Sequence, residues 1–238
     1  MPTFRPLDEE LYELNDLLVR MSDLVEEQFT NAVEALTRCD EAGAKAVRRR
    51  DDDVDALELE VDRRCERMLA LYQPVATDLR ALIVAVKVNT VLERIGDHAK
   101  NVAKEVPFVA CAPRALQAAD FAPLADAVRA QLREAHDAFV GRDRAQAERV
   151  RKQDKEVDRL YRACFGRLVD YGRGHGDDFE AAAHLLTAAK SMERIADHAK
   201  DIADCVVFLV GGEDLRHRRL RRQAAAAEVN GEGGPGAA

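Results

Sequence analysis

The chain has 238 residues and a formal net charge of −8, with 47% hydrophobic and 34% charged residues. This composition is too apolar for a disordered chain and too charged for a membrane protein, and its acidity disfavours nucleic acid as a partner because phosphates would repel it. Aromatic residues make up only 5% and tryptophan is absent, which favours helices over strands.

Hydrophobic periodicity predicts six long helices. In the first, apolar residues recur at steps of three and four from Leu11 to Leu36. Proline ends the second and third helices because it lacks an amide hydrogen, and a loop containing Pro113 and Pro123 follows. Glycines separate the last three helices. The predicted ranges are 8–38, 40–71, 77–106, 123–140, 143–171 and 178–210.

The cysteines and the apolar runs indicate the compartment. Five cysteines without a CxxC pair argue against a disulfide framework or a zinc ribbon and favour a reducing compartment. Cys65 and Cys164 fall on apolar helix faces and are expected in the core. No apolar run approaches the ~20 residues of a spanning helix, and no signal peptide is visible. We therefore expect a soluble cytoplasmic protein.

Comparison of the chain with itself reveals an internal duplication. Residues 32–57 match 135–160 at 11 of 26 positions with an offset of 103, and 93–106 match 193–206 at 9 of 14 positions with an offset of 100. The fold expected is all-α, with two tandem three-helix bundles. The predicted division is 1–110 for the first bundle, 111–211 for the second, and 212–238 for a basic and then Gly/Ala-rich tail that is expected to be disordered.

Each repeat carries two acidic pairs four residues apart, a spacing that stacks two carboxylates on one helix face. Roughly 8 such pairs are expected by chance in a chain this acidic, so one pair alone carries no weight. The pairs gain significance because, in both repeats, they hold the same position on the helix relative to the apolar residues. Oxygen ligands of this kind suit hard cations such as Mg²⁺, Mn²⁺ or oxidised iron. The candidate metal ligands are Asp51, Asp55, Glu93 and Asp97 in the first repeat and Asp154, Asp158, Glu193 and Asp197 in the second, with Asn101 and Asp201 as possible additions.

Spacing alone leaves two interpretations open, metal ligation and a plain ladder of salt bridges on a solvated face. Lys100 and Lys104 lie on the same side of the helix as Glu93 and could neutralise it without a metal. His98 lies about 140° round the helix from Glu93, so it is expected to pack or hydrogen-bond beside the site and not to ligate. No nucleophile–base signature or phosphate-binding loop is recognisable, so no catalytic residue is assigned.

The sequence Glu-Arg-Ile-(Gly/Ala)-Asp-His-Ala-Lys occurs at 93–100 and again at 193–200, each time with an Asp-x-x-x-Asp pair upstream. This doubled motif resembles the signature of the PhoU family of phosphate-signalling regulators, over about residues 8–210. The resemblance implies two similar three-helix bundles side by side, with metal ions or multinuclear clusters held by the paired acidic motifs. Asp201 replaces the asparagine of the motif that the first repeat keeps as Asn101.

The resemblance also implies a function. It predicts a non-enzymatic cytoplasmic regulator, a homodimer, that couples the phosphate ABC transporter ATPase to a sensor histidine kinase. Such a regulator represses the phosphate regulon when phosphate is plentiful, touches the membrane only through its partners, and binds no nucleic acid. Two other functions stay open from the residues: a carboxylate-bridged metal-dependent enzyme and a metal-free helical scaffold.

Overall fold

The computed structural model describes residues 5–110 and 112–212, and every regular element within these ranges is a helix. The elements are α1 (Pro6–Arg38), α2 (Glu41–Tyr72), α3 (Ala76–Lys104), α4 (Val106–Val109), α5 (Pro113–Ala119), α6 (Ala122–Gly141), α7 (Arg144–Gly174), a 3₁₀ turn (Gly176–Asp178) and α8 (Phe179–Gly211). The predicted all-α architecture is confirmed for the described residues.

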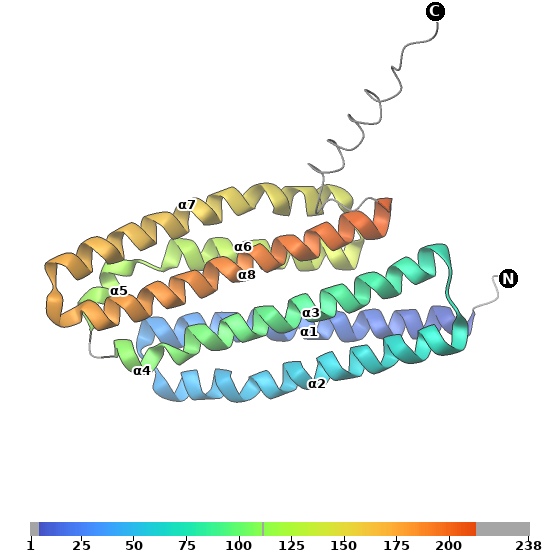
Figure 1. Ribbon diagram of the computed structural model, residues 1–238, viewed down its shortest axis with the longest axis horizontal. Helices are drawn as coiled ribbons and strands as arrows, with labels where there is room; N and C mark the ends of the chain where they lie inside the picture. The colour runs from blue at the N-terminus through green and yellow to red at the C-terminus, as the bar shows by residue number, and fades with distance from the viewer. Residues whose placement is uncertain (1–4, 111, 213–238) are drawn as a thin grey trace, which may run out of the picture.

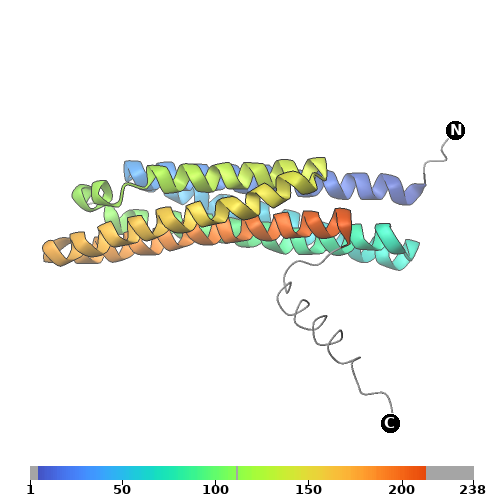
Figure 2. The same ribbon diagram turned by 90° about the horizontal axis from the view of Figure 1, so that it is seen from above.

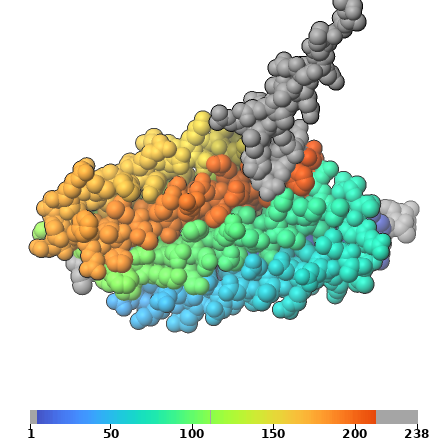
Figure 3. Space-filling model, viewed as in Figure 1, coloured from blue at the N-terminus to red at the C-terminus, as the bar shows by residue number. Residues whose placement is uncertain are grey.

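The long helices form two three-helix bundles that lie along each other (Figure 1). Helices α1, α2 and α3 pack together, and α6, α7 and α8 pack together. Between the bundles, α3 contacts α8 and α1 contacts α6. Seen from above, α1 and α6 lie in one layer and α3 and α8 in the other (Figure 2), and the space-filling view shows α3 and α8 side by side along the molecule (Figure 3).

The apolar stripes predicted from the sequence form the core. On α1, Leu14, Met21 and Phe29 are at most 2% exposed, and they share one face because they lie close to whole turns apart. Ile95 of α3 and its counterpart Ile195 of α8 are fully buried. Cys65 and Cys164 are buried in the core, as predicted.

The same turn joins the first two long helices of each bundle. Cys39 and Arg142 have left-handed backbones, with φ of 53° and 48°, and end α1 and α6. The next residue is an aspartate in both repeats, and its carboxylate accepts hydrogen bonds from the first amides of the following helix. A left-handed backbone is strained for any residue other than glycine. The recurrence of this strained turn in both repeats supports the internal duplication.

The segment between the bundles differs from the prediction. The region around Pro113 was expected to be a loop, but Pro113–Ala119 forms α5, with the proline in its first turn, where a missing amide hydrogen costs nothing. Similarly, α3 ends at Lys104, and Pro107 lies inside the short helix α4. The prediction of a disordered tail falls on residues 213–238, outside the described residues.

The third helices of the two repeats, α3 and α8, are antiparallel at their contact. The rings of His98 and His198, which occupy matching positions, stack with centroids 5.4 Å apart. Further along, Glu105 accepts a hydrogen bond from His184 at 2.6 Å, and Phe108 stacks on the same imidazole. A pseudo-two-fold axis therefore passes close to the His98–His198 stack. In the described ranges no helix is both long enough and apolar enough to span a bilayer.

Candidate carboxylate sites of the two repeats

Helices α2 and α3 bring the predicted ligands of the first repeat to facing surfaces, and Asp51 is the most deeply placed. Its side chain is only 4% exposed, accepts a hydrogen bond from Gln28 Nε2 at 3.1 Å, and forms an ion pair with Lys100. Lys100 also lies 3.7 Å from Asp97. Gly96 gives Gln28 this access, since a Cβ there would lie 3.2 Å from Gln28 Oε1.

The charge of Lys100 offsets part of the repulsion at Asp55, but Lys100 is not among the groups that shift the pKa of Glu93. The pKa of Glu93 is raised to about 7, first by burial and then by the negative charges of Asp97 and of two carboxylates on α2. The pKa of Asp55 is also raised, by loss of hydration and then by Asp51. Both shifts mean that negative charge at this position is unfavourable as long as no cation is bound.

Replacing Glu93 with glutamine is expected to stabilise the metal-free protein in a pH-dependent way. A carboxyl group whose pKa rises from 4.5 to about 7 on folding contributes stability that is complete below pH 4.5 and is lost as the pH approaches 7. Glutamine stays neutral throughout. The free energy of unfolding of Glu93→Gln relative to wild type should therefore increase between pH 4.5 and 7 and stay level above pH 7.

Urea titrations at pH 5, 6 and 8 in buffer with a chelator measure this difference. A difference that does not change with pH would mean that Glu93 is ionised at its ordinary pKa, against the geometry described for it. Lys104 provides the matched control, because its Nζ bonds Asn101 and not Glu93, so Lys104→Met should leave the pH profile of stability unchanged.

The second repeat places the equivalent carboxylates similarly but pairs each with a cation. Lys200 bonds Asp154 at 2.6 Å, as Lys100 does Asp51. The other three ion pairs are Lys190 with Glu193 at 2.6 Å, Arg194 with Asp197 at 3.6 Å and Arg162 with Asp158 at 3.4 Å. These cations offset part of the negative charge of the second repeat, but burial and then the charges of Glu193 and Asp154 still raise the pKa of Asp197.

Three residues of the first site were missed by the sequence prediction. Glu58 and Asp62 continue the acidic face of α2 beyond Asp55, and the charge of Glu58 contributes to the raised pKa of Glu93. Asn89 of α3 is fully buried and donates from Nδ2 to Asp62 Oδ1 and to the Glu58 carbonyl, both at 3.0 Å. The four-residue step from Asn89 to Glu93 was the only sequence signal for this residue.

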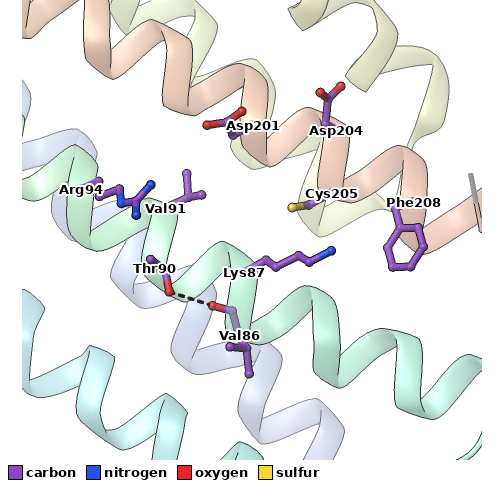
Figure 4. Close-up of a pocket in the computed structure, with 9 residues that line it drawn as sticks. All are labelled: Val86, Lys87, Thr90, Val91, Arg94, Asp201, Asp204, Cys205 and Phe208. Carbon is purple, nitrogen blue, oxygen red and sulfur yellow. Dashed lines mark hydrogen bonds between the residues drawn. The ribbon is translucent and has the colours of Figure 1, made fainter. Parts of the chain in front are cut away.

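The two possible additional ligands have other partners. Asn101 accepts a hydrogen bond from Lys104 at 2.8 Å. Asp201 lies 3.4 Å from His198 Nδ1 and lines a cleft of about 310 Å³ between α3 and α8. Figure 4 shows this cleft, with Lys87 and Arg94 on the α3 wall and Asp201 on the α8 wall.

His98 was expected to pack beside the site and not to ligate, and its ring stacks on His198 in the contact between the repeats. Burial lowers the pKa of His98, and the proximity of His198 lowers it further. Within the described ranges, no three His, Cys, Asp or Glu side chains converge closely enough to hold a metal ion as they stand. Binding an ion would therefore require carboxylates to turn toward one another.

The donors of the first repeat nevertheless suit a hard cation. They are carboxylate oxygens on two facing helices, and the buried Asn89 meets them through its amide nitrogen, which donates to Asp62. Magnesium, manganese and iron are the ions that such oxygen donors favour.

A PhoU domain family model matches the chain twice, over residues 18–106 and 121–206. A relative in Zymomonas mobilis, named phosphate-specific transport system accessory protein PhoU homolog, is 34% identical over 226 residues, covering 95% of each chain. A relative of the same name in Pseudomonas aeruginosa is 37% identical over 225 residues, covering 93% of this chain and 92% of the relative.

Solved structures agree with these sequence matches. The crystal structure of PhoU from Pseudomonas aeruginosa superposes with a TM-score of 0.82 at 36% identity, covering 87% of this chain and 99% of that one. The phosphate transport system regulatory protein PhoU from Streptococcus pneumoniae superposes with a TM-score of 0.77 at 25% identity, covering 88% and 99%. The arrangement of two three-helix repeats is therefore shared with both.

Proposed function

The chain belongs to the PhoU family, and from this membership we propose that it regulates phosphate uptake and phosphate-starvation signalling. The observation that carries the proposal is the match over nearly the whole chain to accessory proteins of phosphate-specific transport systems. The repeated motif of 93–100 and 193–200 lies on the two helices that meet between the bundles, so both copies belong to one continuous structure.

The proposed partners are the ATPase of the phosphate ABC transporter and a sensor histidine kinase. The fold suits this role because two rigid bundles offer long helical faces, and no catalytic constellation was assigned from the sequence. We propose a cytoplasmic location, where both partners would present surfaces, and a homodimer as the working form. The protein acts by binding, and repression of the phosphate regulon is its proposed output when phosphate is plentiful.

Metal binding is part of the proposal. The motif carboxylates of α2 and α3, with those of α7 and α8, are the residues that would hold the ions. A bound cation would supply positive charge that joins two helices and reduces repulsion between their carboxylates. Lys100 and Lys200 each pair with the first aspartate of the α2 or α7 motif, which in the first repeat leaves Asp55 and Glu93 to the cation.

Deletion of the gene tests the regulatory role. In a strain without any other copy of the family, deletion should raise alkaline phosphatase activity several-fold in phosphate-rich medium, because repression is lost. Expression of the wild-type chain in the same strain should restore low activity. Phosphatase activity that stays low after deletion would contradict the proposed function.

A further inference from the structure

The third helices of the two repeats enclose a cleft along part of their contact. Its volume of about 310 Å³ lies at the lower end of the range for small-molecule sites, roughly 300–1,000 Å³. The α3 wall carries Lys87 and Arg94, and the α8 wall carries Asp201 and Asp204 (Figure 4). In the described ranges its lining comes from α3 and α8 alone, so the cleft exists only where the two bundles pack together.

The two cations of the α3 wall have no carboxylate partner. Seven residues separate Lys87 from Arg94, which is close to two helical turns, so both side chains leave α3 on the same side. Arg94 is exposed and Lys87 half-buried, and neither is in an ion pair among the residues that the structure describes. Two unpaired positive charges on one wall of a cleft attract an anion.

The carboxylates of the opposite wall do not cancel this charge. Asp204 is in an ion pair with Arg151 at 2.6 Å, and its side chain is only 13% exposed. Asp201 lies across the cleft from Arg94 without pairing with it, and is 3.4 Å from the Nδ1 of His198 (Figure 4). The cleft therefore has an excess of positive charge, and Asp201 can accept a hydrogen bond from an amino or hydroxyl group of a ligand.

The floor of the cleft is apolar and includes the aromatic ring of Phe208. The repeat offset pairs Phe208 with Phe108, on which the His184 ring stacks with centroids 4.1 Å apart and planes at 5°. The first repeat has the buried Val84 at the position of His184. In place of a flat ring, the Nζ of Lys87 lies over Phe208, 4.9 Å from the ring centre. The counterpart thus shows that a planar heterocycle fits on this phenylalanine.

The charge, shape and size of the cleft indicate one class of ligand, and we propose that it binds a nucleoside monophosphate. Arg94 holds the phosphoryl group through paired hydrogen bonds, and Lys87 moves from the ring to add a second positive charge. The base then covers the ring of Phe208, and its amino group or a ribose hydroxyl donates to Asp201. The site is separate from the motif pairs, so this inference goes beyond the proposed function and does not depend on metal binding.

Equilibrium dialysis of the full-length chain against radiolabelled adenosine monophosphate (AMP), in buffer with EDTA, tests the proposal. Wild-type protein should bind one AMP per chain saturably. Inorganic phosphate and adenosine should each compete at least tenfold less effectively than unlabelled AMP, because each makes only part of the contacts. The proposal is overturned if AMP does not bind saturably, if phosphate competes as well as AMP, or if adenosine does.

Replacing both cations should remove most of the affinity. Lys87→Met/Arg94→Gln should weaken AMP binding at least tenfold, since charge-assisted hydrogen bonds to the phosphoryl group are lost. Lys45→Met/Arg49→Gln is the matched control, because it makes the same substitutions on the exposed surface of α2. This control should change the affinity less than twofold. Equal weakening by the two pairs would indicate a general effect of net charge and would refute the site.

Two further measurements separate binding from damage to the fold. The urea midpoint of Lys87→Met/Arg94→Gln should match that of wild type, since neither cation is in an ion pair within the described part of the chain. Arg94→Lys keeps the charge and should bind AMP more tightly than Arg94→Gln does. Equal affinities of these two single variants would contradict the role given to Arg94.

The cleft and the proposed function fail on different readouts. If AMP does not bind to wild-type protein but deletion of the gene raises phosphatase activity, the cleft proposal alone is refuted. If AMP binds saturably but phosphatase activity stays low after deletion, the regulatory role alone is refuted.

Discussion

Lys100→Met is expected to lower the free energy of unfolding at pH 7 by about 3 kcal/mol, since removing one partner of a buried ion pair strands the other charge. The stranded group is Asp51, whose side chain is 4% exposed and keeps only the Gln28 hydrogen bond. Lys100 itself is 29% exposed, which places the effect at the lower end of the range for buried pairs. Urea unfolding in buffer with EDTA measures this change in the free energy of unfolding.

The second repeat provides a matched comparison. Asp154 is 15% exposed and Lys200 35%, so water can partly replace the lysine and Lys200→Met should cost only about 1 kcal/mol. Neutralising the stranded carboxylate should restore stability, so the double variant Asp51→Asn/Lys100→Met should recover most of the unfolding free energy that Lys100→Met loses. Equal effects of the two lysine variants, or no rescue by Asp51→Asn, would show that Asp51 is not the group that Lys100 stabilises.

The raised pKa of Lys100 gives the same ion pair a pH signature. Its bond to Asp51 raises the pKa above the ordinary 10.5, so the stability from this pair is complete below pH 10.5 and is lost as the pH rises through the value in the folded protein. Wild-type stability should therefore converge toward that of Lys100→Met in strongly alkaline buffer and differ most at neutral pH.

Phe29→Ala is expected to destabilise the protein by about 3–5 kcal/mol, which is typical for loss of a fully buried aromatic ring. Phe29 lies on α1 and is among the largest side chains that are fully buried. It belongs to the hydrophobic core that packs α1 against α2 and α3, which carry the first carboxylate site. The urea midpoint should fall, and Mn²⁺ binding should persist wherever the variant stays folded.

A surface aromatic residue on the same helix serves as control. Tyr12 is 75% exposed, so Tyr12→Ala should change the free energy of unfolding by no more than about 0.5 kcal/mol. If Phe29→Ala lowers the free energy of unfolding as little as Tyr12→Ala does, the core around α1 must relax to fill the volume of the missing ring. That result would conflict with close packing around Phe29.

Much of the fold could be predicted because it depends on patterns of short range. Apolar residues spaced three and four apart decide which face of a helix is buried, and the duplicated segments fix two equivalent bundles. The helix at 113–119 was missed because the prolines were interpreted as breakers, whereas a proline in the first turn of a helix is favourable.

The site was only partly predictable from the sequence, for a physical reason. Self-comparison highlights what the repeats share, so it found Asp51 and Glu93 but not Glu58, Asp62 and Asn89, which exist in one copy only. The burial of Asp51 and its pairing with Lys100 depend on how α2 packs against α3 and α1, and helix spacing contains no such information.

Crystals of the full-length chain grown with Mn²⁺ give the most direct test of the central claim that cations join α2 and α3 in the first repeat. The account predicts an anomalous peak between these helices, next to the motif carboxylates Asp55, Glu93 and Asp97. Crystals without a peak between α2 and α3 would contradict it.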